Sequence, residues 1–156
     1  MTGSKPSQAF VTGPDGVGLT ELGILPGGSF SFAVGINNAG QVAGLSDTKT
    51  RQQHAFIADP NGAGMTDLGT LGGGRSSAEG IDNAGRVVGW AQTSTVATHA
   101  FITGPNGAGM KDLGTIGEAD SEAYAINNAG QVAGWWAPSK GTIKDTLLSP
   151  GQTESA

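Results

Sequence analysis

Apolar residues in this chain alternate with polar ones over short stretches, and glycine-rich turns separate these stretches. No segment carries the period of an amphipathic helix. Residues 36–44 show the pattern best, because Ile and Val flank the sequence Asn-Asn-Ala-Gly. Asn closes a turn with its own side chain and Gly readily takes a positive φ, so the pattern predicts a β-hairpin. We expect its strands over residues 33–36 and 41–45.

The same hairpin occurs three times at a fixed spacing of 45 residues, with copies that contain Ile36, Ile81 and Ile126. A second hairpin precedes each copy. It has an Ala-Phe strand, a turn with Asp-Gly or Asn-Gly, and a strand that ends in Leu-Gly. Each repeat therefore contains four short strands in about 45 residues, the size of one β-propeller blade.

The repeats divide the chain into five parts. Residues 1–7 are polar, and we expect them to be a disordered lead-in. The three repeats cover 8–53, 54–98 and 99–143. The tail, 144–156, begins like a repeat but lacks the His-Ala-Phe pattern, so we interpret it as a degenerate fourth-repeat stub or a cap.

Three blades are too few for a ring, because propellers close with four to eight blades. Unpaired sheet edges also invite pairing with another chain. We therefore predict an all-β, β-propeller-like fold of three four-stranded repeats, with the ring completed by oligomerisation. A homodimer with six blades is favoured. The alternative is a three-fold barrel like a β-trefoil, which would be a monomer.

Composition excludes several classes of function. The net charge is −5, and binding to nucleic acid or to an anionic membrane surface needs a basic face. The chain has no cysteine, so disulfides and thiolate zinc sites are excluded. No apolar window is long enough to span a membrane as a helix. Residues 1–7 lack the apolar segment of a signal peptide.

Three strings occur in the repeats, each with equivalents that are identical or similar: His-Ala-Phe, Leu-Gly-Thr-Leu-Gly-Gly and Ile-Asn-Asn-Ala-Gly-Gln-Val. Together they resemble the HAF repeat family of bacterial proteins, over about residues 8–137. The last string also resembles the inner hairpin of NHL-type propeller blades. The resemblance implies a repeat fold and an extracellular or cell-surface location, and the family has no established catalytic residues. Gln8 departs from the pattern, because the family has His there.

Aromatic residues near the Asn-Ala-Gly hairpins are the first candidates for ligand binding. They can pack between blades, or they can stack on a sugar or bury against a protein partner. Arg75, in a glycine-rich loop, can reach an anionic ligand. The candidate ligand-binding residues are Trp90, Trp135, Trp136, Arg75 and Tyr124.

The histidines and repeated carboxylates have simpler interpretations. His54 and His99 are the only histidines and occupy equivalent positions, so we expect them to brace turns rather than bind a metal. Glu21, Asp67 and Asp112 are also equivalent, and we expect them on a solvated strand face. We predict no metal site and no cofactor, since the run of glycines at 72–74 lacks the Lys and Ser/Thr of a phosphate loop.

The sequence favours a non-catalytic binding or assembly module, because near-identical repeats hold loops of varied sequence for a carbohydrate or protein ligand. A purely structural self-assembling scaffold is the alternative. An enzyme acting on glycans ranks lower, since it needs polar residues that break the repeat symmetry. Those residues are Arg75, Glu118, Asp120, Glu122 and Tyr124.

Overall fold

The computed structural model describes residues 3–117 and 119–138, which form twelve β-strands. The strands pair antiparallel in two hairpins and two four-stranded sheets. The predicted all-β class is confirmed. The predicted tail, 144–156, lies outside the described residues.

The N-terminal hairpin contains β1 (Ala9–Thr12) and β2 (Leu19–Gly23). The first sheet contains β3 (Ser31–Ile36), β4 (Val42–Asp47), β5 (Gln53–Ala58) and β6 (Met65–Gly69). The second sheet contains β7 (Gly72–Ile81), β8 (Val87–Thr93), β9 (Thr98–Thr103) and β10 (Met110–Gly114). The C-terminal hairpin contains β11 (Ala119–Ile126) and β12 (Val132–Pro138). Short 3-10 turns at Pro14–Gly16, Pro60–Gly62 and Pro105–Gly107 lie between the Ala-Phe strands and their partners.

The Asn-Ala-Gly turns have the expected geometry. Asn37 Oδ1 accepts the backbone N–H of Ala39 at 3.1 Å and that of Gln41 at 2.9 Å. Gly40 ends the turn with a φ of +82°, a conformation that costs glycine little. The predicted hairpin is confirmed as β3 and β4, and its two later copies are β7–β8 and β11–β12.

The four-stranded sheets do not coincide with the sequence repeats. Each takes its Asn-Ala-Gly hairpin from one repeat and its Ala-Phe hairpin from the next, because β4 pairs with β5 and β8 pairs with β9. The described chain therefore has two four-stranded sheets and two separate hairpins, where the sequence predicted three four-stranded units. These four sheets form no closed ring or barrel within the described residues.

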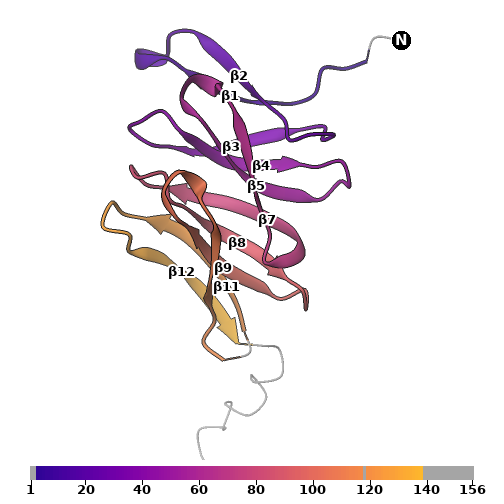
Figure 1. Cartoon of the computed structure of the whole chain (residues 1–156), viewed down its shortest axis with the longest axis vertical. Coiled ribbons are helices and arrows are strands. Elements are labelled where there is room, and N and C mark those ends of the chain that lie inside the picture. Colours follow the sequence, from indigo (N-terminus) through magenta and orange to yellow (C-terminus); the bar gives the residue numbers. More distant parts are fainter. Residues whose placement is uncertain (1–2, 118, 139–156) are drawn as a thin grey trace, which may run out of the picture.

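The sheets stack in chain order along the long axis, from β1–β2 at one end to β11–β12 at the other (Figure 1). Apolar clusters fill the three spaces between successive sheets. Within the described residues, no helix is long and apolar enough to cross a membrane. The stack therefore has two ends, and the side chains at these ends define the site described next.

Candidate functional site

Three equivalent phenylalanines differ sharply in burial. Phe56 on β5 and Phe101 on β9 are 0% exposed, whereas Phe10 on β1 is 53% exposed. Phe56 is opposite Gly44 on the neighbouring strand, and a Cβ at Gly44 would lie 2.9 Å from the Phe56 ring. Among the described strands, β1 pairs only with β2, so no strand covers Phe10 from the other side.

An open hollow of about 250 Å³ lies at the C-terminal end of the stack. Its apolar lining includes Leu113, Ile116 and Val132. Ile116 is 66% exposed, whereas the equivalent Leu25 is 3% exposed because Phe56 and other apolar residues of the first sheet pack in the same cluster. The C-terminal hollow therefore lies where an Ala-Phe hairpin would complete the sheet.

A second open hollow, of about 260 Å³, lies at the N-terminal end. Phe10, Ala33 and Ile36 border it. Ala33 is exposed, whereas the equivalent Ala78 and Ala123 are buried. Ala78 is covered because it packs in a cluster with residues of the preceding sheet. The N-terminal hollow therefore lies where an Asn-Ala-Gly hairpin would stand.

The two ends are thus complementary. The N-terminal hairpin corresponds to the second half of a four-stranded sheet, since β1 is equivalent to β5 and β9. The C-terminal hairpin corresponds to the first half, since β12 is equivalent to β4 and β8. Within residues 3–117 and 119–138, each end presents the hairpin that the other end lacks.

Polar contacts between sheets follow the same repeat. Asn38 donates its backbone N–H to Asn83 Oδ1 at 2.9 Å, and Asn83 donates its own N–H to Asn128 Oδ1 at 3.0 Å. The three asparagines stand at the same turn position, 45 residues apart. They form an asparagine ladder along one side of the stack.

Both histidines brace their own hairpins, as expected. His54 Nδ1 lies 2.9 Å from Asp67, and His99 Nδ1 lies 2.8 Å from Asp112. Asp67 also accepts the N–H of Gly69 at 2.7 Å. Both aspartates are exposed on their strands, as predicted, and they also accept hydrogen bonds within the hairpin. No group of three or more possible metal ligands occurs within residues 3–117 and 119–138.

The structure brings two of the candidate aromatic residues together at one carboxylate. Tyr124 donates its hydroxyl to Glu122 Oε2 at 2.8 Å, and Trp135 donates its indole N–H to the same oxygen at 3.3 Å. This hydrogen bond to Glu122 raises the pKa of Tyr124 above its ordinary value. The exposed Trp136 borders the C-terminal hollow.

The other two candidates lie elsewhere. Trp90 is on β8 and Arg75 is on β7, so both belong to the second sheet and not to the C-terminal hairpin. Sequence reasoning did not single out Phe10, Leu113 or Ile116. Each has an equivalent residue in the other repeats, and only the strand pairing shows which of these equivalent residues are exposed.

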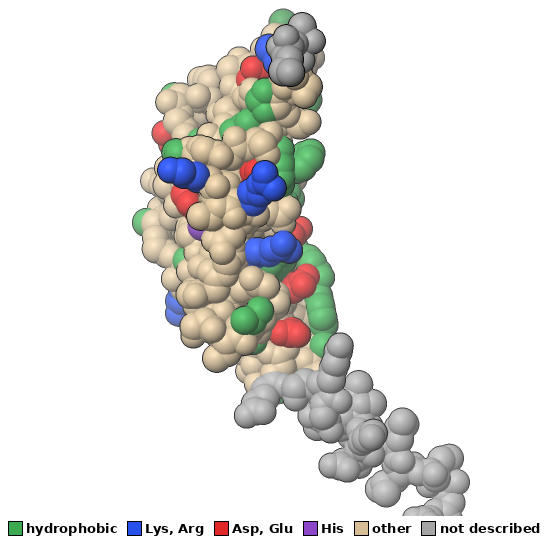
Figure 2. Space-filling model, turned by 90° about the vertical axis from the view of Figure 1, so that its right-hand side faces the viewer, with side chains coloured by type: hydrophobic (Ala, Val, Ile, Leu, Met, Phe, Trp, Pro, Cys, Tyr) green, Lys and Arg blue, Asp and Glu red, His purple; other side chains and the backbone are tan. Residues whose placement is uncertain are grey.

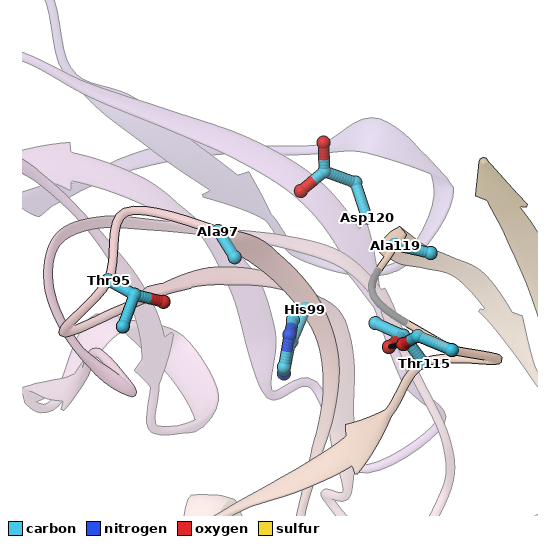
Figure 3. A pocket seen from close by; sticks show the side chains of 7 residues that line it. Thr95, Ala97, His99, Thr115, Ala119 and Asp120 are labelled. Carbon is cyan, nitrogen blue, oxygen red and sulfur yellow. Dashed lines mark hydrogen bonds between the residues drawn. The ribbon is translucent and has the colours of Figure 1, made fainter. Parts of the chain in front are cut away.

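A third open hollow, of about 480 Å³, lies between the second sheet and the C-terminal hairpin. In Figure 3, His99 stands between the loop that carries Thr95 and the segment that carries Thr115. Asp120 Oδ1 accepts the N–H of Thr98 at 2.9 Å. Hydrogen bonds therefore engage both His99 and Asp120, and Glu118 lies outside the described residues.

The face shown in Figure 2 has basic and acidic side chains interspersed, with no single charged surface. Comparisons with protein-family models, curated proteins and solved structures found no match to this chain. The candidate function therefore depends on the geometry of the two ends.

Proposed function

We propose that this chain is a non-catalytic assembly module that joins to other β-sheet repeats through its two open ends. The observation that carries the proposal is the half-sheet at each end, where Phe10 and Ile116 are exposed although their equivalents are buried or partly buried. Burial of such apolar surface favours association, and pairing of an exposed strand edge adds backbone hydrogen bonds.

Self-association into a closed dimer is the favoured form. The described residues of each chain supply two complete sheets and two half-sheets, so two joints between two chains give six four-stranded sheets in all. Six lies within the usual number of blades in a propeller. The resemblance to the HAF repeat family supports an extracellular or cell-surface setting for this assembly.

The solution mass tests the proposal. Light scattering coupled to size-exclusion chromatography is expected to give twice the chain mass of 15.5 kDa over a wide dilution series. A larger species would support assembly but not the dimer. A single 15.5 kDa species at every concentration would contradict an assembly function.

A ligand-binding role for the same hairpin is the second candidate. It is favoured by the arrangement of Tyr124 and Trp135, two exposed aromatic residues that share the Glu122 carboxylate. Exposed aromatic rings beside a hydrogen-bonding carboxylate are suited to stacking on a sugar. A protein ligand could use the same exposed surface.

A glycan array followed by titration of each positive glycan is the direct test of this second role. We expect Trp135→Ala to abolish binding. The control is Phe32→Ala, because Phe32 is an exposed aromatic outside this group. Absence of any glycan binding at millimolar concentration, or equal loss in both variants, would contradict a carbohydrate site.

A further inference from the structure

We infer that the joint between two copies of the chain is a composite four-stranded sheet. In this sheet, β1 of a second copy pairs with β12 of the first in the register of the internal sheets. The strand order across the joint is β11, β12, then β1 and β2 of the second copy. This inference rests on the proposed assembly function and adds to it the partner, the polarity and the register.

The two internal sheets define the register. Gly44 is opposite Phe56, and Gly89 is opposite Phe101. By the same alignment, Gly134 is opposite Phe10 of the second copy. At the end of the strands, Asp47 is opposite Gln53 and Gln92 is opposite Thr98, so the alignment pairs Ala137 with Ser7.

The C-terminal hollow fits the Phe10 side chain of the second copy. Phe56 packs in one cluster with Leu22 and Leu25, and their equivalents at the other end are Leu113 and Ile116. Leu113 and Ile116 both border the hollow and are exposed. The joint would bury Phe10 over them, which is the arrangement of the buried phenylalanines inside the stack.

The N-terminal hollow receives the reciprocal contact. Ala43 of β4 packs in one cluster with Ala78, across the space between the first and second sheets. The equivalents across the joint are Ala133 of the first copy and Ala33 of the second copy, which borders the N-terminal hollow of that second copy. The two hollows are therefore two halves of the same interface, and one strand pairing fills both.

The asparagine ladder supports the polarity of the joint. Each rung runs from a backbone N–H to the Asn side chain of the following copy of the turn. The next rung joins the N–H of Asn128 to Oδ1 of Asn38 in the second copy. All rungs then point the same way, so the interface is head-to-tail, and it can close into a ring.

Cysteine cross-linking tests the register, because the natural chain has no cysteine. Directly opposite residues on antiparallel strands have Cα atoms about 4.5 to 5.5 Å apart, within the range that a disulfide spans. Ser7→Cys and Ala137→Cys are prepared as separate chains and mixed under mild oxidation. We expect a cross-linked pair only in the mixture, and none from either variant alone.

The control replaces Ala137→Cys with Ala133→Cys, which moves the thiol four residues along β12. Four residues of strand span about 13 Å, too far for a disulfide to Ser7→Cys. A cross-link in the control, or between identical variants, would overturn the register or the polarity.

Light scattering on the same samples separates two kinds of failure. An assembly that forms without the predicted cross-link would overturn the composite sheet but keep the proposed function. A chain that stays at 15.5 kDa would contradict both.

A second measurement does not depend on cysteine. Phe10→Ala should weaken the dimer by about 30-fold in Kd, the effect of a central aromatic contact of about 2 kcal/mol. Phe32→Ala is the matched control, since Phe32 is 55% exposed and borders neither hollow. Both variants should keep the wild-type circular dichroism. Equal Kd values for the two variants would overturn the role of Phe10.

Discussion

Ala55 donates its backbone N–H to the side-chain oxygen of Ser76 at 2.8 Å, across 21 residues of sequence. The serine hydroxyl donates in turn to the backbone carbonyl of Gly69. Ser31 and Ser121 make the same pair of contacts at the other two spaces between sheets. One buried hydroxyl therefore ties each Ala-Phe hairpin to the sheet that follows it.

Ser76→Ala is expected to lower the free energy of unfolding by about 1 to 3 kcal/mol, because it leaves the buried N–H of Ala55 without an acceptor. Urea unfolding followed by circular dichroism measures the loss. Ser94→Ala is the control, since Ser94 is exposed, and it should change the free energy by no more than about 0.5 kcal/mol. Equal losses in the two variants would contradict the role of Ser76.

The sequence predicted the hairpins well because local chemistry decides them. Asn37 and Gly40 close the turn within a few residues, and the same turn chemistry recurs in each copy. The association of hairpins into sheets depends instead on pairing across the polar loops, as between Asp47 and Gln53. Turn residues carry no information about that pairing, so the predicted repeat units and the observed sheets differ.

The site was less predictable for the same reason. Phe10 and Phe56 have similar local sequences, and Phe10 is exposed because β2 is the only neighbour of β1 among the described strands. The serines that join the sheets did carry a signal, since Ser31, Ser76 and Ser121 recur every 45 residues. Their role depends on tertiary contacts, which periodicity alone does not define.

Asp112→Ala should destabilise the second sheet modestly. The Asp112 carboxylate accepts the N–H of Gly114 at 2.6 Å and pairs with His99. Because the carboxylate is partly exposed, water replaces some of this bonding, and we expect a loss of about 0.5 to 1.5 kcal/mol in urea unfolding. Lys111→Ala, an exposed neighbour with no such contacts among the described residues, is the control. A loss that does not exceed the control would contradict bracing by Asp112.

The buried Asp47 carboxylate should make stability depend on pH. Burial alone would raise the pKa of Asp47, but hydrogen bonds from the Ser29 hydroxyl and from the N–H groups of Phe30 and Ser29 outweigh it and lower the pKa. The folded pKa then lies below the unfolded one. The resulting stability is present above the unfolded pKa of about 4 and is lost as pH falls through the folded pKa.

Asp47→Asn removes the contribution of Asp47 to the pH dependence of stability. At neutral pH the variant should be less stable than the wild type, and the difference should shrink as pH falls below about 4, where the wild-type carboxylate takes up its proton. Urea unfolding of both chains across this pH range gives the difference directly, because the other carboxylates contribute equally to both. A difference that stays constant with pH would contradict the lowered pKa.

An ion pair at one turn replaces an amide pair at its two equivalents. Asp82 is buried and accepts the Arg86 Nε–H at 2.6 Å. At the equivalent positions, Asn37 Nδ2 donates to Gln41 Oε1 at 2.8 Å, and Asn127 donates to Gln131 in the same way. The chain itself therefore shows that a neutral pair fits this turn.

This comparison predicts strong coupling between positions 82 and 86. Arg86→Gln alone should lower the free energy of unfolding by about 1 to 3 kcal/mol, because it leaves a buried carboxylate without its cation. Adding Asp82→Asn should restore part of that loss, since the double variant recreates the pair of Asn37 and Gln41. A double-mutant cycle by urea unfolding should then give a coupling energy of about 0.5 to 3 kcal/mol. Additive losses would show that the ion pair and the amide pair are not equivalent solutions for this turn.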